Sequence, residues 1–499
     1  MKFLWILLLF VPFLGTAQLQ VADIFSDNMV LQRGERVHVW GKGIPGKEVL
    51  VSFALNRKNA VVNPDSSWSV HFKKQKANSY PQSIQIRSDN EVIELKNILI
   101  GDLWVCIGQS NMEWPMKSEM HFNEELPTVN QPSLRFYNPT YAGKNVFTTG
   151  FSDSISQRLN VNDFYTGQWQ VSDSISVPNM SAVAYYFGKK IVDDIHVPIG
   201  LIHLAIGGAP LETFISRDAL QNNIQFSAKA TGNWLTNEAL PVWARQRGHE
   251  NTADNANISS DSLGLNHAFK PGFAFESGIK PILYQPIKGI LIYQGESNAQ
   301  EIERVNEYSD LMKLMVDDYR NQWQQRGMPF YFVQLSSIDT THYKGHLWPA
   351  FRDGQRRILK EIKYSGMAVS SDIGARNDVH PRNKKAVGER LARWALNKTY
   401  KKHIVPSGPL PLKAKYVNGS IIISFQYIAN GLQTADGKML RGFSTDGKTA
   451  INAIIRNKKI IISAKEKPGF IYYAWEPFTK ANLVNSASLP ASTFKINVQ

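Results

Sequence analysis

The sequence has a single cysteine among its 499 residues, so no disulfide can join two parts of the chain. Stability must come from packed hydrophobic cores, which a chain of this length can build without cross-links. The one thiol, Cys106, lies in the apolar run 103–107, where burial is the expected fate of a cysteine. The Cys and His spacings that bind zinc, the Walker loop and the dinucleotide-binding fingerprint are also missing, so we expect no metal and no cofactor.

Runs of charge of one sign are missing too. Lys and Arg number 56 against 42 Asp and Glu, a formal net charge of +14, but the basic residues are spread thinly along the chain. Proteins that bind nucleic acid gather such charge in a patch or stripe, so we expect no nucleic-acid partner. A basic surface also suits anionic glycans.

A long hydrophobic run occurs once, at residues 3–14. It is shorter than the roughly 20 residues that span a bilayer. Lys2 precedes the run and Gly15-Thr16-Ala17 follows it, which is the layout of a secretory signal peptide cut after Ala17. We therefore expect residues 1–17 to be a signal peptide, the mature protein to have no membrane span, and its location to be periplasmic or extracellular.

Apolar and polar residues alternate in the next segment, residues 18–97. Four runs show this period of two, with turn-forming residues between them: 36–40, 49–53, 68–72 and 83–86. Short alternating strands at this spacing are typical of an antiparallel sandwich. No catalytic constellation is present there, so we interpret the segment as a structural or sugar-contacting module.

The pattern changes at residue 98. Five short apolar runs have the length of buried parallel strands: 103–107, 200–206, 289–293, 330–335 and 367–370. Residues 181–194 and 303–325 are predicted to be helices between them. Strands that alternate with helices predict an α/β domain with right-handed crossovers over residues 98–402. Residues 217–278, rich in Asn, form a long excursion from it with no firm assignment.

Period-two alternation returns in the last hundred residues. It is clearest in the runs 420–425, 459–463 and 470–475, with Gly, Asp and Asn between them. These runs predict a second β module over residues 403–499.

Polar, loop-forming clusters follow four of the predicted strands. They are residues 108–112 (GQSNM), 207–209 (GGA), 294–298 (QGESN) and 377–381 (NDVHP). In open α/β sheets, ligands bind beyond the carboxyl ends of the strands. The four clusters should therefore converge on one edge of the sheet and form a site there.

Two of the clusters supply a serine and a histidine, Ser110 and His380. A serine hydroxyl is a poor nucleophile until a base takes its proton and an acid orients that base. Donors must then stabilise the oxyanion, each worth roughly 3 kcal/mol. The candidate donors are the glycines, which allow close backbone approach, and two side-chain amides: Gly207, Gly208, Gln294 and Asn298.

The four clusters closely resemble the four motif blocks of the sialate O-acetylesterase family, which are SGNH-type hydrolases and include acetylesterases of plant polysaccharides. The resemblance covers nearly the whole chain after residue 17, and GQSNM and QGESN are its specific blocks. It implies an α/β fold, an SGNH-hydrolase-like parallel sheet sandwich flanked by N-terminal and C-terminal β-sandwich-like modules. It also implies a serine esterase that removes O-acetyl groups from carbohydrate.

By this resemblance Ser110 is the nucleophile and donates its own N–H to the oxyanion hole. Gly207 or Gly208 adds a second N–H, and His380 is the general base. Which further amide completes the hole stays open.

The acid that orients His380 also stays open. In the wider SGNH pattern it lies three residues before the histidine, where this chain has Asn377. Asp378 is the nearest carboxylate along the chain. Glu296, Asp372 or a backbone carbonyl are the alternatives, and Glu296 is also a candidate substrate contact.

The expected substrate is an O-acetylated sugar or glycan, foremost a 9-O-acetylated sialic acid. A forked guanidinium would recognise the sialic acid carboxylate, and Arg352 and Arg376 are the candidates. Gln109 and Trp114 are candidate sugar contacts. The alternatives are an acetylesterase of plant polysaccharide such as acetylated xylan, a non-catalytic carbohydrate-binding protein, and a long-chain lipase.

Overall fold

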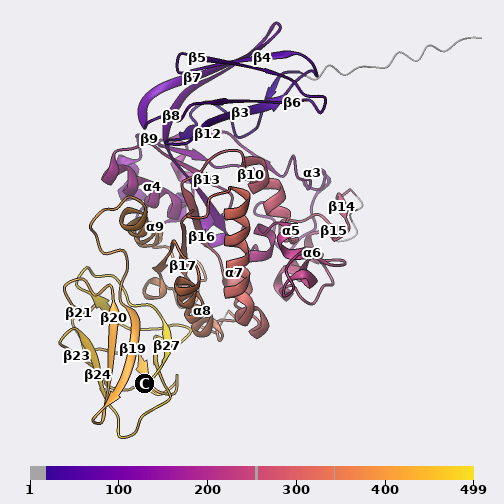
Figure 1. The fold of residues 1–499 in the computed structure, drawn as a ribbon. Coiled ribbons are helices and arrows are strands. Elements are labelled where there is room, and N and C mark those ends of the chain that lie inside the picture. Colours follow the sequence, from indigo (N-terminus) through magenta and orange to yellow (C-terminus); the bar gives the residue numbers. More distant parts are fainter. Residues whose placement is uncertain (1–17, 253–254, 256, 342) are drawn as a thin grey trace, which may run out of the picture.

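A computed structural model gives the fold and describes residues 18–252, 255, 257–341 and 343–499. The predicted signal peptide, residues 1–17, lies outside the described residues. The described chain is a mixed α/β structure in which two β regions lie at opposite ends of a central region of strands and helices (Figure 1). None of the helices within the described residues has the length and apolar character needed to cross a bilayer.

Antiparallel strands build the N-terminal region, as its alternation predicts. One sheet has the order β1-β3-β6, and in the other β4 pairs with β5 and β7. Side chains on one face are buried, including Val39 of β3 opposite Val70 of β6. The strands are β1 (Gln20–Val21), β2 (Val30–Gln32), β3 (Val37–Lys42), β4 (Glu48–Phe53), β5 (Asn56–Val61), β6 (Ser67–Phe72) and β7 (Asn78–Ser88).

Strand β8 (Glu91–Gly108) runs from the N-terminal region into the centre of the molecule. Its first part pairs with β7 and β2, and its second part pairs in parallel with β13 (Ile199–His203) and β16 (Gly289–Tyr293). The predicted boundary at residues 97–98 thus falls inside one strand. Buried side chains of the two regions also form one continuous hydrophobic cluster.

The central sheet has the order β12-β9-β13-β8-β16-β17-β18. Its five predicted parallel strands are confirmed, because β13, β8, β16, β17 (Phe330–Gln334) and β18 (Ser365–Val369) pair in parallel. Two strands at one side were not predicted: β9 (Gln131–Tyr137), parallel to β13, and β12 (Trp169–Ser172), antiparallel at the edge. Only the second half of β9 is buried and β12 has four residues, so neither forms a long apolar run.

Helices cover the sheet on both sides. Helix α4 (Ala182–Ile195) packs against α9 (Lys384–Trp394), and α7 (Ile302–Gln322) packs against α8 (Trp348–Glu361). Figure 1 shows α4 and α9 on one side of β13, β16 and β17, and α7 on the other. The two predicted helices are confirmed as α4 and α7, and the Ser181 hydroxyl caps α4 by accepting a hydrogen bond from the Ala184 N–H at 3.1 Å.

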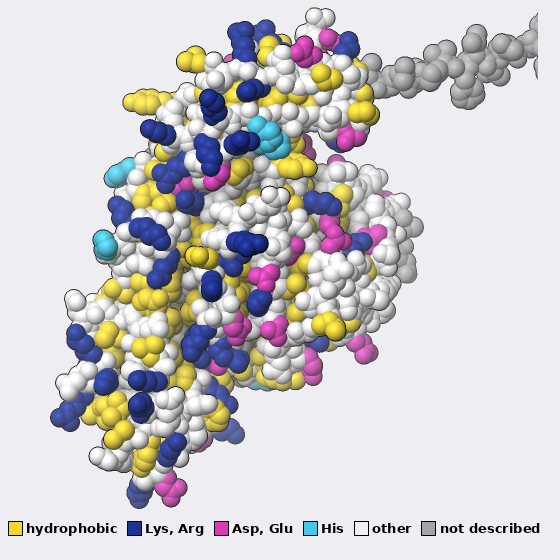
Figure 2. All heavy atoms as spheres, in the orientation of Figure 1, with side chains coloured by type: hydrophobic (Ala, Val, Ile, Leu, Met, Phe, Trp, Pro, Cys, Tyr) yellow, Lys and Arg dark blue, Asp and Glu magenta, His cyan; other side chains and the backbone are white. Residues whose placement is uncertain are grey.

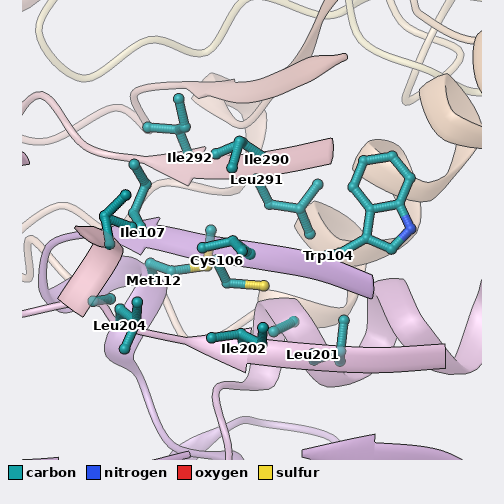
Figure 3. Packing of buried hydrophobic residues seen from close by; sticks show 14 of the residues in the cluster. Trp104, Cys106, Ile107, Met112, Leu201, Ile202, Leu204, Ile290, Leu291 and Ile292 are labelled. Atoms are coloured by element: carbon teal, nitrogen blue, oxygen red, sulfur yellow. The ribbon is translucent and has the colours of Figure 1, made fainter. Parts of the chain in front are cut away.

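Large apolar side chains fill the space between the sheet and its helices. Trp104 and Cys106 of β8 lie beside Ile202 of β13 and Leu291 of β16 (Figure 3). Cys106 has no exposed surface, so its predicted burial is confirmed, and this burial raises the pKa of its thiol well above the ordinary range. This tightly packed sheet is a rigid base for the loops at its carboxyl edge.

Short elements make up the excursion at residues 217–278 and the remaining loops of the central region. Those of the excursion are α5 (Arg217–Gln221), η5 (Ser227–Ala230), α6 (Val242–Thr252), β14 (Ser260–Asp261) and β15 (Gly264–Leu265), followed by η6 (Phe275–Ile279) and η7 (Lys280–Ile282). The others are α1 (Ser110–Glu113), η1 (Met116–Ser118), α2 (Phe122–Glu125), η2 (Leu126–Thr128), β10 (Thr140–Tyr141), α3 (Asp153–Gln157), β11 (Tyr165–Thr166), η3 (Val177–Asn179), η4 (Leu211–Phe214), η8 (Glu296–Asn298), η9 (Ser371–Ile373) and η10 (Ala395–Thr399).

The C-terminal region is antiparallel and has its own hydrophobic cluster. It packs on the central region, because the Thr493 and Lys495 N–H groups donate to the side chains of Gln334 and Asp353 at 3.2 and 3.1 Å. Its strands are β19 (Leu410–Val417), β20 (Ser420–Gln426), β21 (Leu432–Thr434), β22 (Phe443–Ser444), β23 (Ile454–Arg456), β24 (Lys459–Ser463), β25 (Phe470–Tyr473), β26 (Leu483–Asn485) and β27 (Phe494–Asn497).

Basic side chains are scattered over this surface. Figure 2 shows Lys and Arg over all three regions of one face, with no single continuous basic patch. The distribution agrees with the sequence, in which basic residues are also dispersed.

Candidate active site

Ser110 and His380 meet at the carboxyl edge of the central sheet. Ser110 begins α1, separated from the end of β8 only by Gln109, and His380 lies in the loop between η9 and α9. The Ser110 Oγ and the His380 Nε2 are 2.8 Å apart, a hydrogen-bond distance. Gly108 has φ +133°, and a Cβ there would lie 2.1 Å from the Tyr293 carbonyl oxygen. Only glycine at this position therefore allows the backbone turn that leads from the end of β8 to Ser110.

A cavity of 540 Å³ opens beside this pair and is lined by both residues. Its walls come from several of the sheet-edge loops and from the excursion at residues 217–278. The excursion contributes aromatic, basic and polar side chains: Trp243, Arg247, Asn251, His267 and Phe269. The segment without a firm assignment from sequence therefore forms one wall of the cavity.

Backbone amides suited to an oxyanion hole lie on the cavity wall. Among the described residues, no hydrogen-bond acceptor is found for the N–H groups of Ser110 and Gly208. The Gly208 carbonyl accepts hydrogen bonds from the Ser297 hydroxyl at 2.8 Å and the Trp243 indole at 3.1 Å, which fixes the orientation of the loop. Gly207 instead donates its N–H to the Tyr141 hydroxyl at 3.2 Å. The geometry favours Ser110 and Gly208 as donors.

The side chains of Gln294 and Asn298 point into the protein interior, which corrects their predicted role in the oxyanion hole. Both are almost completely buried and do not line the cavity. The Asn298 amide donates to Glu212 at 3.0 Å, and its oxygen accepts from the Gln294 amide at 2.7 Å. Because both side chains are held in this buried network away from the cavity, they are not placed to donate to an oxyanion there.

Gln109 lines the cavity, but its side chain also holds a loop. The Gln109 Oε1 accepts hydrogen bonds from the Ser297 N–H at 3.2 Å and from the Gln294 amide at 3.3 Å. It ties the loop after β8 to η8.

Of the candidate acids, Asp378 lies nearest the imidazole. Its Oδ1 is 3.6 Å from the His380 Nδ1 and accepts a hydrogen bond from the His380 N–H at 2.8 Å. Asp372 forms a paired ion contact with Arg390, with both oxygens at 2.7 Å from the guanidinium. Glu296 accepts a hydrogen bond from Asn111 at 2.5 Å. The structure thus leaves Asp378 as the candidate best placed to orient His380.

The surroundings of His380 favour its neutral, basic form. Burial and the positive charge of Lys384 lower the pKa of His380 to about 4, against the opposing effect of Asp378. The Trp114 ring stacks on the imidazole, with 5.2 Å between centroids and 22° between planes. Trp114 does not line the cavity, so its predicted role as a sugar contact is corrected to packing against the His380 imidazole.

Behind the serine, Asn111 joins three groups. Its amide donates to Glu296 and, at 3.0 Å, to the carbonyl of Val379 in the loop that carries His380. Its oxygen accepts a hydrogen bond from Lys384. Burial raises the pKa of Glu296 to about 7 and lowers that of Lys384 to about 7. This buried network, Glu296–Asn111–Lys384, links the serine loop to the histidine loop.

Neither predicted carboxylate-binding arginine lies at the cavity, which corrects both assignments. Arg352 is fully buried and donates to the carbonyls of Ala474 and Glu476, at 3.1 and 2.5 Å, so it anchors the C-terminal region. Arg376 pairs with Asp339 at 2.5 Å and lines a separate hollow beside the C-terminal region.

Several residues of the site were not predicted: Tyr141, Trp243, Arg247, Phe269 and Lys384. All lie outside the motif blocks: Tyr141 ends the short strand β10, Phe269 lies in a loop, and the other three lie in the helices α6 and α9. No residue pattern distinguishes them from ordinary surface or core residues. The fold alone brings the first four to the cavity and Lys384 to Asn111 behind it.

Comparison with known proteins relates this chain to carbohydrate esterases. Residues 276–397 match the family described as carbohydrate esterase, sialic acid-specific acetylesterase. The sialate O-acetylesterase of Mus musculus is 26% identical over 451 residues, covering 81% of this chain and 78% of that protein. The sialate O-acetylesterase of Homo sapiens is 25% identical over 442 residues, covering 81% and 76%.

A solved structure has the same overall fold. The carbohydrate acetylesterase from Xanthomonas citri superposes with a TM-score of 0.77 at 24% identity, covering 96% of this chain and 99% of that one. These matches make the chain similar to sialate O-acetylesterases over most of its length, and it is an esterase.

Proposed function

We propose that this protein removes O-acetyl groups from carbohydrates, foremost from 9-O-acetylated sialic acid, through an acetyl-enzyme on Ser110. The observation that carries the proposal is the 2.8 Å contact between the Ser110 Oγ and the His380 Nε2 on the wall of a cavity large enough for a sugar. The names of the similar proteins support the same substrate class.

The proposed reaction has two steps. The Ser110 Oγ attacks the acetyl carbonyl carbon while its proton passes to the His380 Nε2. The amides of Ser110 and Gly208 stabilise the oxyanion, the bond to the sugar oxygen breaks, and that oxygen takes the proton from His380. Water then attacks the acetyl-serine with His380 again as base, and this step releases acetate and restores the serine hydroxyl.

The organisation predicted from the sequence becomes part of the proposal. Residues 1–17 serve as a signal peptide that sends the protein to the periplasm or out of the cell. Residues 98–402 carry the chemistry, and residues 18–97 and 403–499 are the modules at either end. The amino-terminal residue of protein purified from the native host tests the signal peptide, since cleavage after Ala17 leaves Gln18 first.

Acetate release by the purified mature protein tests the function. We expect release from 9-O-acetylated sialic acid, measured beside acetylated xylan. Release from xylan alone would retain the esterase chemistry but reject sialic acid as the substrate. Release from neither would contradict carbohydrate deacetylation.

We expect Asp378→Asn to lower kcat by about 10- to 100-fold, with a smaller effect on KM. In a catalytic triad, replacing the carboxylate that contacts the imidazole lowers kcat roughly 10⁴-fold. The loss of kcat in Asp378→Asn should be smaller, because the Asp378 carboxylate is half-exposed and lies 3.6 Å from the His380 Nδ1. Asp372→Asn is the matched control and should change kcat by less than about twofold, since its exposed contact is with Arg390. Equal effects of the two variants would remove Asp378 from the mechanism.

The pH profile should show the low pKa of His380. A general base works when unprotonated, so kcat/KM should rise with pH through a pKa of about 4 and then level off. The pKa is low because burial and Lys384 both disfavour the imidazolium. Acetate release measured from about pH 3 to pH 8 locates this acid limb. A limb near 6.5, the ordinary histidine value, would contradict a net lowering of the His380 pKa by its surroundings.

A further inference from the structure

The wall of the cavity that comes from α6 carries an arginine that no motif indicates. Arg247 lines the cavity together with Trp243 and Asn251 of the same helix. Its guanidinium lies 4.8 Å from the centroid of the Trp243 ring, so the aromatic face positions it.

The guanidinium of Arg247 is buried with much of its hydrogen-bonding capacity unused. The residue is 9% exposed, and its Nε and Nη1 find no hydrogen-bond partner among the described residues. The half-exposed Glu250 lies 3.4 Å from the Nε, without hydrogen-bond geometry. A buried cation without hydrogen-bond partners is costly, so such groups are usually paired.

The other charges at the cavity favour an anionic ligand. Lys344 adds a second positive charge to the lining. The carboxylate in the lining, Glu301, accepts a hydrogen bond from the Val242 N–H at 2.9 Å at the start of α6. His267 is neutral, because burial and the charge of Arg247 lower its pKa to about 3. These groups leave the Arg247 guanidinium as the buried, incompletely paired donor in the cavity.

We infer that Arg247 binds the carboxylate of an acidic sugar and thereby selects O-acetylated sialic acid over neutral acetylated sugars. The inference rests on the proposed function, whose substrate it specifies. A planar guanidinium can donate two parallel hydrogen bonds to a carboxylate, which gives both affinity and orientation. Arg247 thus takes the role predicted from the sequence for Arg352 and Arg376, which the structure places elsewhere.

The test compares 9-O-acetylated sialic acid with its methyl ester, which keeps the sugar and the acetyl group but lacks the negative charge. The wild-type protein should show kcat/KM roughly 10- to 100-fold higher for the acid than for the methyl ester. In Arg247→Gln this ratio should fall to near one. Arg245→Gln, two residues earlier on α6 and outside the cavity lining, should keep the wild-type ratio.

A binding measurement separates this inference from the proposed function. Titration of sialic acid into the Ser110→Ala protein and into Ser110→Ala/Arg247→Gln should show Kd weaker by roughly 10- to 100-fold in the second. Binding lost with Arg247 but no acetate release by the wild type would reject the esterase proposal and keep the carboxylate site. Equal rates of the wild type on acid and methyl ester, with equal Kd values, would overturn the role of Arg247, and the rate comparison needs no variant that has to fold.

Discussion

Ser110→Ala is expected to lower kcat for acetate release by at least about 10⁴-fold while the protein stays folded. The hydroxyl is the group that contacts the His380 Nε2, at 2.8 Å, and removing one oxygen from the cavity wall leaves the core unchanged. Acetate release and a far-ultraviolet circular dichroism spectrum of the same sample measure the two parts of the prediction.

A second serine of the cavity provides the control. Ser297 also lines it, but its hydroxyl donates to the Gly208 carbonyl, so Ser297→Ala should cost much less than Ser110→Ala. If Ser110 and His380 act as one unit, Ser110→Ala/His380→Ala should be no slower than Ser110→Ala alone. Multiplied losses in the double variant, or a fully active Ser110→Ala, would contradict the acetyl-enzyme.

Lys384→Met is expected to destabilise the protein by about 3 kcal/mol and to raise the pKa of the acid limb. Methionine keeps the length and packing of the lysine stem. It removes the donor to the Asn111 oxygen and the charge that lies near Glu296. It also removes the cation that holds down the pKa of His380.

The neighbouring lysine is the matched control. Lys385 extends toward Glu125 at 3.6 Å and is partly exposed, so Lys385→Met should cost no more than about 1 kcal/mol and leave the acid limb in place. Urea titrations of the wild type and both variants compare stability, and acetate release against pH locates the limb. Similar results for the two lysines would mean that the buried network, Glu296–Asn111–Lys384, neither stabilises the fold nor tunes the base.

The parts of this molecule that follow short-range rules could be predicted from the sequence. Parallel strands such as β16 are continuous apolar runs, and the loops after them carry the polar blocks. The carboxyl ends of parallel strands lie at one edge, so the sequence alone predicts that Ser110 and His380 lie close together, as they do. The edge strand β12 could not be predicted, because its four residues are too few to show a clear alternation of apolar and polar side chains.

The roles of individual side chains were harder to predict from the sequence, because they depend on which groups the fold brings together. Arg352 and Arg247 are both arginines near polar segments in the sequence, yet one anchors the C-terminal region and the other lines the cavity. Arg352 has its role because it contacts Ala474 and Glu476, which lie more than a hundred residues further along the chain. Such contacts leave no local pattern to find.

Strand β8 restricts where recombination could join this chain to a segment of another protein. Recombination at residues 97–98 would cut through a paired strand and remove its partners β2 and β7, while the hydrophobic cluster shared by the two regions would lose one side. The C-terminal region keeps a cluster of its own and meets the rest through a small set of buried hydrogen bonds, such as those of Gln334 and Arg352. A genetic exchange could therefore replace the C-terminal region as one unit if the new segment keeps these hydrogen bonds, whereas the N-terminal region must be passed on together with the central sheet.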